Sequence, residues 1–406
     1  MFGTERAVVR GSYGVFFAHP FDAGVPNAAA LGFSVSVTLN TPDNGITAPF
    51  YVRNGVSGAA VAPTLDDRYG VVPVGTNPNT AVTFFEQNRR AGYSHQINLG
   101  IQHQLSGSSV IEVTVLGNMS HKLASSNVTL NQIPPSILGP QHQTQRDRPF
   151  PQFSDVQIQC PTFGDSRYYA AMARYQKRYS HGLSLVGHYT WSRFFVNAND
   201  AGSTLGDNGN PYSNYYNRSA DWGNAANDIR HRFSASVVYE LPFGKGKRWL
   251  NVSPLRFLVG GWSLSGVGTI QSGPPMTIST QTNSTNAFSA GALRANVLGN
   301  PNLSPDQRSV ARWFDTSAFA QPAPYTFGNQ GVGLTRAAGI VNFDISVQRS
   351  FRITERIKFE LRGESFNTFN RTNLGLPARV FGAAGFGVIS SSGPARSIQG
   401  GVRTPF

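Results

Sequence analysis

A two-residue alternation of apolar and polar side chains is the feature that most constrains how this chain can fold. Every second residue is apolar, and the residues between are mainly polar, in the runs 97–101, 111–115, 183–191, 233–241, 341–347 and 357–361. Because side chains alternate across a β-strand, this period places the apolar residues of each run on one sheet face. β-branched and aromatic residues dominate these runs, which disfavours helices. The pattern therefore predicts an all-β fold.

The lengths of the expected strands and their connections distinguish a membrane barrel from a soluble sandwich. We expect ten long strands, near 6–17, 93–104, 108–118, 166–178, 183–195, 231–241, 259–271, 340–350, 357–369 and 396–406. Short links at 105–107, 179–182, 242–258 and 351–356 alternate with long ones at 18–92, 119–165, 196–230, 272–339 and 370–395. Tilted membrane strands need about 9–11 residues, and outer-membrane barrels have short turns on one side and long loops on the other. An antiparallel transmembrane β-barrel is therefore expected, with a soluble, secreted β-sandwich binding module as an alternative.

Aromatic residues stand near the ends of the expected strands. They are Tyr189, Trp191, Tyr239, Phe243, Trp249 and Trp262. Aromatic side chains are enriched where a bilayer meets water, because an apolar ring and a polar tip both find a matching environment there. Packing in a protein core is the other interpretation of these rings. Their positions at strand ends favour the membrane barrel.

The composition excludes several other classes of protein. Only 14% of the 406 residues are charged, whereas about a quarter are charged in an average soluble domain. No apolar run reaches the about 18–20 residues of a transmembrane helix. The net charge is +13, but the basic residues are scattered along the chain, so no nucleic-acid partner is expected.

No catalytic or cofactor-binding motif is recognised, and the chain is not expected to be an enzyme. Cys160 is the single cysteine, so no internal disulfide can form, and a free thiol in a loop is expected. The glycine-lysine stretch 244–248 lacks the spacing and the hydroxyl residue of a phosphate-binding loop. The stretch 261–265 lacks the final glycine of a nucleophile elbow.

No metal site is expected either. His95 and His103 share a strand face, but a separation of eight residues places them roughly 25 Å apart, too far to bind one ion. An oxygen-rich loop contains Asn197, Asn199, Asp200, Asp207 and Asn208. Calcium is conceivable there, but Ala201 stands where an EF-hand loop has an oxygen ligand, so a solvated external loop is expected.

The polar face of the expected sheet carries charges of both signs. Its cations are Arg10, Arg174, Arg178, Arg232, Lys358, Arg362 and Arg403, and its anions are Glu112, Glu240, Asp344, Glu360 and Glu364. Ion pairing inside a barrel and contact with a plug explain such a mixture, while an anion-selective path is the alternative.

Several motifs, in their order and spacing, are similar to a known family. They are the stretches 177–182, 189–193, 228–233, 239–246, 260–262, 271–275 and 362–370. In addition, Ile398, Val402 and the terminal aromatic Phe406 resemble the last-strand signal read by the barrel assembly machinery, although Pro405 is unusual next to last. Together these features resemble the barrel end of Oar-like TonB-dependent outer-membrane receptors, which carry an N-terminal carboxypeptidase-regulatory-like domain. The resemblance covers nearly the whole chain.

The resemblance implies a location in the bacterial outer membrane and a larger assembly than this chain provides. Receptors of this type have a plug domain, a segment that contacts TonB and a barrel of about 22 strands. About ten strands, no plug domain and no signal peptide are recognised here, so residues 1–406 are expected to form a C-terminal half of such a barrel. A complete ten-stranded barrel is the alternative.

The implied function is solute uptake or surface binding through the long external loops. A non-transporting surface adhesin or a structural outer-membrane barrel is the alternative, and an in-frame plug-encoding stretch upstream would favour transport. The implied partners are outer-membrane lipid, the barrel assembly machinery, and TonB through the plug domain. No cofactor is expected, and the loops contain no motif that identifies the solute.

Overall fold

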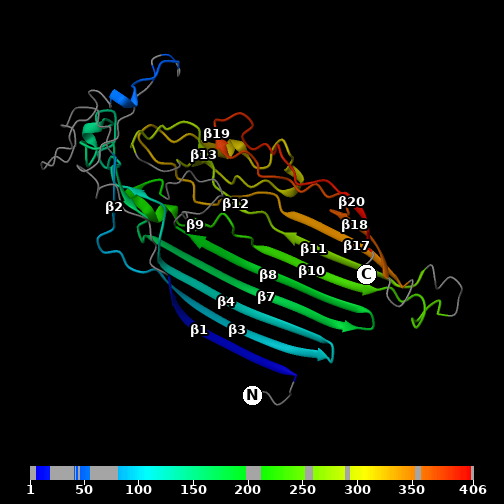
Figure 1. The fold of residues 1–406 in the computed structure, drawn as a ribbon. Helices are drawn as coiled ribbons and strands as arrows, with labels where there is room; N and C mark the ends of the chain where they lie inside the picture. Colours follow the sequence, from blue (N-terminus) through cyan, green and yellow to red (C-terminus); the bar gives the residue numbers. More distant parts are fainter. Residues whose placement is uncertain are drawn as a thin grey trace.

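The computed structural model describes residues 6–18, 41, 43, 46–54, 81–197, 212–251, 259–288, 293–352 and 358–403. Ten long strands form one antiparallel sheet in which each strand pairs with its neighbours along the chain (Figure 1). These strands are β1 (Ala7–Phe17), β3 (Tyr93–Ser106), β4 (Ser109–Leu123), β7 (Gly164–Ser180), β8 (Leu183–Val196), β10 (His231–Glu240), β11 (Trp262–Gln271), β17 (Ile340–Arg352), β18 (Lys358–Phe366) and β20 (Ser397–Arg403). The all-β fold and the ten strands expected from the alternation are confirmed.

Several strand boundaries differ from those expected. Strand β4 is the largest case, because it continues to Leu123 rather than ending at 118. Strand β18 ends at Phe366 rather than at 369, because Asn367 and Asn370 have positive φ angles of 48° and 49° and turn the chain. The Asp344 side chain fixes this end by accepting a hydrogen bond of 2.8 Å from the Asn367 backbone N–H. Strand β11 begins at Trp262 rather than at 259, after Gly261 with a φ of +78°.

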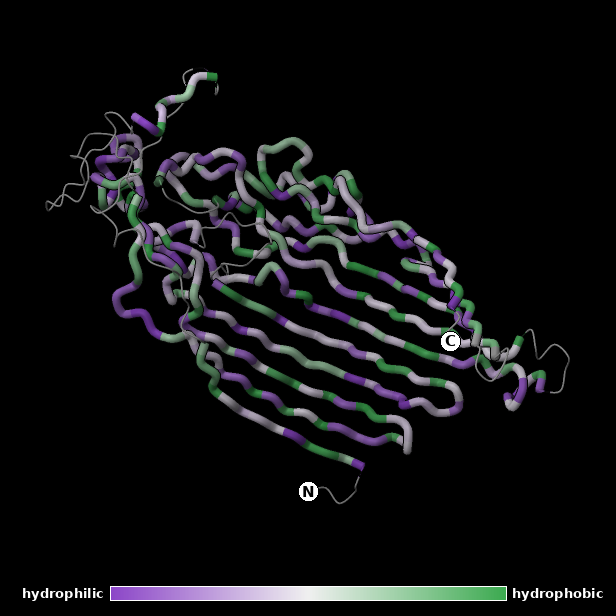
Figure 2. Tube along the Cα trace, viewed as in Figure 1, coloured by the Kyte–Doolittle hydropathy of each residue, from purple (hydrophilic) through white to green (hydrophobic). Residues whose placement is uncertain are grey.

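The register places most apolar side chains of these strands on one continuous face. Directly paired residues share a face, and one such row is Val9, Ile101, Val113, Ala173, Tyr189, Phe233, Ile270 and Val341. The neighbouring row on the other face is Val8, Gln102, Glu112, Arg174, His188, Ser234, Thr269 and Asn342. Figure 2 shows apolar and polar residues alternating along the strands.

The apolar face is open to its surroundings. Ile97, Leu99 and Ile101 in the middle of β3 are each at least half exposed, at 53%, 50% and 54%. A soluble monomer rarely leaves so broad an apolar face uncovered, so this face requires a second apolar phase, such as the interior of a bilayer.

The aromatic residues near the strand ends lie mainly on this apolar face. Tyr189 and Trp191 on β8 are 41% and 45% exposed, and Tyr189 is hydrogen-bonded to His231 over 2.8 Å. At the opposite end of the sheet, Trp249 is 50% exposed and its ring lies 5.5 Å from that of Phe243. Core packing therefore does not account for Tyr189, Trp191 or Trp249.

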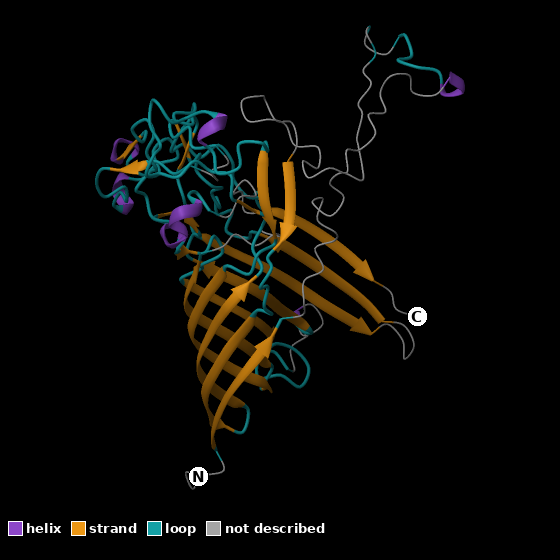
Figure 3. Ribbon diagram, turned by 90° about the vertical axis from the view of Figure 1, so that its left-hand side faces the viewer, coloured by secondary structure: helices purple, strands orange, loops and turns teal. Residues whose placement is uncertain are grey.

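The sheet is curved and open (Figure 3). Within the described part of the chain, β1 is paired only with β3, and β20 only with β18. An unpaired backbone group at membrane depth costs several kcal/mol, so both edges require a strand partner in a bilayer.

The remaining strands and 3-10 helices are short and lie in the connections. The strands are β2 (Ala81–Phe85), β5 (Val128–Thr129), β6 (Asp155–Gln159), β9 (Gly223–Asn224), β12 (Pro275–Met276), β13 (Ser279–Thr280), β14 (Asn296–Val297), β15 (Phe319–Ala320), β16 (Thr335–Arg336) and β19 (Val380–Phe381). The 3-10 helices are η2 (Val52–Asn54), η3 (Gln145–Asp147), η4 (Tyr215–Asp221), η5 (Pro305–Gln307) and η6 (Thr316–Ala318). Among the described residues, no helix is both long and apolar enough to cross a membrane.

Adjacent substitutions on β10 test the assignment of the two faces. Val237 lies on the apolar face opposite Leu185 and Gly266, while Ser236 points to the polar face. We expect Val237→Arg to lower the free energy of unfolding by about 2–4 kcal/mol at the bilayer midplane, and by less nearer the interface. Ser236→Arg, the matched control, is expected to have a much smaller effect. Denaturant unfolding of the protein in lipid vesicles measures both values, and equal destabilisation would contradict the assignment.

Candidate functional site

The described residues of 81–92, 119–165, 212–230, 272–339 and 370–395 lie together at one end of the sheet and form a cap (Figure 1). Strand pairs join segments from different connections, as in the parallel pairs β2–β6 and β13–β19. β13 lies in the connection between β11 and β17, whereas β19 lies in the connection between β18 and β20. Backbone hydrogen bonds therefore link loops that are far apart in the sequence.

The cap has a hydrophobic core of its own. Its buried members are Met276, Ile278, Ala295, Phe314, Ala318, Phe319 and Ala337. The rings of Phe314, Phe319 and Phe386 contact one another edge to face, with centroids 5.2–5.9 Å apart. A packed core gives these loops a defined shape, as a preformed binding surface requires.

Gln132 and Ile133 connect three loop segments within the cap. Its side-chain amide donates to Asn214 over 3.0 Å, and its side-chain oxygen accepts from the Tyr215 backbone N–H over 2.8 Å. The next residue, Ile133, donates its backbone N–H to the Ala287 carbonyl over 2.8 Å. Gln132 is 1% exposed. Its hydrogen bonds satisfy buried polar groups that would otherwise destabilise the folded state.

A buried ion pair joins two further loops. Asp221 and Arg294 are hydrogen-bonded to each other, with each side chain 7% exposed, and Ser213 donates its hydroxyl to Asp221 over 3.1 Å. Burial raises the pKa of the Asp221 carboxyl, whereas Arg294 and Ser213 act in the opposite direction. Burial also raises the pKa of the nearby Tyr212 phenol to about 12. Removing one member of such a pair leaves a buried charge without compensation.

A second ion pair anchors the cap to the sheet. The Asp228 side chain is fully buried, pairs with Arg336 and accepts a 2.8 Å hydrogen bond from the Phe194 backbone N–H on β8. Arg336 also donates to the carbonyl oxygens of Asp228 and Gly273, over 2.9 and 3.1 Å. Gly273 is required here, because a Cβ atom would lie 1.9 Å from the Ala337 carbonyl oxygen.

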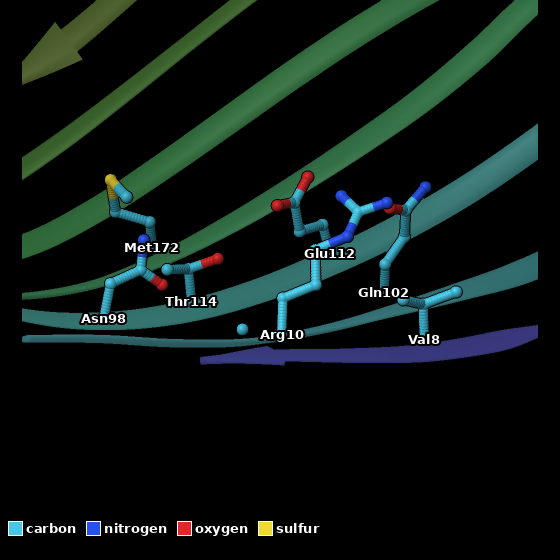
Figure 4. A pocket seen from close by; sticks show the side chains of 8 residues that line it. Val8, Arg10, Asn98, Gln102, Glu112, Thr114 and Met172 are labelled. Atoms are coloured by element: carbon cyan, nitrogen blue, oxygen red, sulfur yellow. The ribbon is translucent and has the colours of Figure 1, made fainter. Parts of the chain in front are cut away.

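The polar face of the sheet contains a hollow of about 300 Å³ between β1, β3, β4 and β7. Figure 4 shows side chains from these strands, including Arg10, Asn98, Gln102, Glu112 and Thr114, projecting to the same side. They offer hydrogen-bond donors, acceptors and charges of both signs.

Three of the acidic residues predicted for the polar face form ion pairs. Glu112 lies 3.7 Å from Arg174, and Glu364 pairs with Arg362, which are both predicted cations. Glu240 lies 2.7 Å from Lys247, which belongs to the turn that follows β10. The prediction of mixed charges with internal pairing agrees with this geometry.

The other residues considered in the sequence are not brought into one site. His95 is hydrogen-bonded to Tyr13 over 2.8 Å, whereas His103 lies opposite Ala7 near the other end of the strand. Among the described residues, no group of three or more His, Cys, Asp or Glu side chains is placed to hold a metal ion. Asn197 accepts a hydrogen bond from the Asp165 backbone N–H. Asn199, Asp200, Asp207 and Asn208 lie outside the described residues.

Cys160 is a buried free thiol, as expected for a cysteine without a partner, and burial raises its pKa. The assembly-signal residues Ile398 and Val402 lie on the apolar face of β20, opposite Ser365 and Leu361, and are 74% and 64% exposed. Phe406 lies outside the described residues, and the role of these three residues in assembly stays a prediction.

The cap residues that fix the loops were not identified from the sequence. The partners Asp221 and Arg294 are 73 residues apart, and Asp228 and Arg336 are 108 apart. No local pattern links positions so distant. The motif 228–233 did contain Asp228, but only as part of a family resemblance.

The sequence matches the family described as "Outer membrane beta barrel domain" over residues 1–399. No curated protein sequence matches the chain.

Solved structures that this chain is similar to include the outer membrane transporter YddB from Escherichia coli, with a TM-score of 0.38 and 9% identity over 80% of this chain and 34% of that chain. The ferric-catecholate import receptor Fiu from K12 E. coli has a TM-score of 0.39 and 9% identity, over 99% and 33%. P. aeruginosa FpvA has a TM-score of 0.40 and 8% identity over 98% of this chain and 31% of that chain. This chain spans about a third of the length of each.

Replacing Arg336 tests whether the Asp228 pair holds the cap in place. We expect Arg336→Met to destabilise the cap by about 3–5 kcal/mol, because Asp228 would keep a buried charge without a partner. The control is Arg312→Met, which removes an exposed pair with Asp315 worth about 0–1 kcal/mol. Rates of proteolysis within 272–339 in isolated membranes measure the difference. Equal rates for the two variants would show that the pair does not anchor the cap.

Proposed function

Because the chain belongs to the outer membrane beta barrel domain family and is located in the bacterial outer membrane, we propose that it is the receptor portion of a TonB-dependent solute transporter. In this proposal the cap captures a solute outside the cell, and the polar face of the sheet lines part of its route inward. The chain performs no catalysis.

The folded cap is the observation that carries this proposal. The cap residues lie at one end of the sheet. Strand pairs link several of the connections, a hydrophobic core joins residues of 272–339 with Phe381 and Phe386, and two buried ion pairs join 212–230 with 272–339. In outer-membrane barrels the long loops face outside and the short turns face the periplasm. An ordered surface at the outer end is suited to binding a solute, because little conformational entropy is then lost on binding.

The open sheet supports the proposal that residues 1–406 are part of a larger barrel. Both β1 and β20 need strand partners within the bilayer, and a barrel of about 22 strands would supply them. Such a barrel has room for a plug, through which TonB would act. We further propose that the barrel assembly machinery recognises the last strand through Ile398, Val402 and Phe406.

A test of the partial barrel is expression of residues 1–406 behind a signal peptide. We expect no heat-modifiable, protease-resistant band in outer membranes, because two unpaired edges would each expose backbone groups to lipid. A resistant monomer that conducts ions in planar bilayers would instead establish a closed ten-stranded barrel.

A test of the transport function compares cells that express the full-length protein with and without TonB. We expect faster depletion of at least one solute from a defined medium only when both proteins are present, measured by mass spectrometry. The Arg336→Met variant should reduce this depletion, and Arg312→Met should not. An adhesin or a structural barrel would produce no TonB-dependent depletion.

A further inference from the structure

A hollow of about 480 Å³ lies at the end of the sheet opposite the cap, between two of the short turns. One turn contributes His181 and Gly182, and the other contributes Pro242, Gly246, Lys247, Arg248 and Trp249. The last residues of β10, Tyr239 and Glu240, complete its wall. This hollow has no role in the proposed capture of a solute by the cap.

The segment 241–251 in this wall is strongly basic. It contains Lys245, Lys247 and Arg248 and no acidic residue. Glu240 compensates only one of these charges, through its 2.7 Å ion pair with Lys247. Lys245 and Arg248 are exposed, and the Arg248 guanidinium lies 5.8 Å from the centre of the Trp249 ring. Of these cations, Lys247 and Arg248 line the hollow, and Lys245 is exposed on the same turn. The turn therefore presents the exposed Arg248 and Lys245 to an anion.

The same hollow lies at the border of the apolar face. Tyr239 belongs to that face, because it pairs with Leu183 and Leu264 in the register. Tyr179 and Trp249 are 59% and 50% exposed beside it. Aromatic rings next to basic side chains are typical of the level at which lipid headgroups lie.

The turn holds its cations in a fixed arrangement. Trp249 donates its backbone N–H to the Pro242 carbonyl over 3.0 Å, and Gly244 donates to the Trp249 carbonyl over 3.0 Å. The Gly246 N–H donates to the Asn251 side chain over 2.7 Å. Gly244 and Gly246 have φ angles of +103° and +74°, which residues with a Cβ rarely adopt. The basic side chains thus extend from an ordered loop.

We propose that this hollow binds the headgroup phosphate of an anionic phospholipid in the inner leaflet of the outer membrane. The phosphate would lie near Arg248 and His181, and the acyl chains would extend along the apolar face from Tyr239 toward Val237. Charge complementarity selects an anionic headgroup, and continuity with the apolar face selects a lipid over a free anion. The assignment to the inner leaflet rests on the proposed orientation, with the cap outside the cell.

The test is native mass spectrometry of the full-length protein purified from outer membranes and supplied with phosphatidylglycerol or phosphatidylcholine of the same chains. We expect preferential retention of phosphatidylglycerol. The double variant Lys245→Gln, Arg248→Gln should bind phosphatidylglycerol about 30-fold more weakly. Each Lys or Arg near an anionic lipid surface raises the affinity about fivefold, and two are removed. The matched control is Lys122→Gln, Arg90→Gln, because Lys122 lies near the last residue of β4 and the exposed Arg90 precedes β3, at the cap end of the sheet. This control should retain the lipid as the unsubstituted protein does.

Equal retention of both lipids, or no difference between the two double variants, would overturn the proposal. Displacement of phosphatidylglycerol by millimolar inorganic phosphate would also overturn it, because a free anion would then be the occupant. Both variants should keep a heat-modifiable band, which confirms that they fold. Labelling of Lys245→Cys by an impermeant maleimide on intact cells would refute the orientation separately, whether or not the lipid is retained.

Discussion

The fold depends on the requirement that every backbone N–H and C=O group inside a bilayer be hydrogen-bonded within the protein. The ten-stranded meander meets this requirement for the eight strands that lie between its two edge strands, because every neighbouring pair is antiparallel. The register shifts only near strand ends, in the pairs β3–β4, β4–β7 and β7–β8. The same pairing aligns the alternating side chains, so the apolar face is as continuous as the hydrogen-bond ladder. A shift of one residue in any pair would move an entire strand's apolar residues to the polar face. Hydrogen bonding and patterning therefore specify the same register.

The cap depends on different forces from those that hold the sheet. Its strands are too short for ladders to stabilise it, since pairs such as β12–β16 and β14–β15 contain two residues per strand. Stability comes instead from the core around Phe314 and from the buried pairs Asp221–Arg294 and Asp228–Arg336. Because each pair joins loops from different connections, opening one loop would leave buried charges in another without partners. We infer that the connections 212–230 and 272–339 open together.

The sequence predicted the sheet well because its determining signal is local. Alternation is visible within a few residues, and it located all ten long strands. The bounds were less accurate: β18 and β11 are shorter than expected where Asn367 and Gly261 turn the chain, and β4 continues five residues beyond the expected end, to Leu123. The cap could not be predicted in this way. Gln132 contacts Asn214, and the core that contains Ile278 combines residues of 272–339 with Phe381 and Phe386, so the determining contacts are long-range. The resemblance supplied the family, but no motif indicated which loop residues would be buried.

The distribution of charge distinguishes the role of the polar face of the sheet from that of the cap. On the polar face, acidic residues such as Glu112 and Glu364 lie beside arginines, so its described part does not present an electrostatic field of one sign. A polar face of mixed charge can form hydrogen bonds with a polar solute or a plug, but it discriminates weakly between anions and cations. Selectivity then has to arise where loops converge with a fixed shape. In the proposed receptor that place is the cap, where the packing of residues distant in sequence defines the surface presented to the solute.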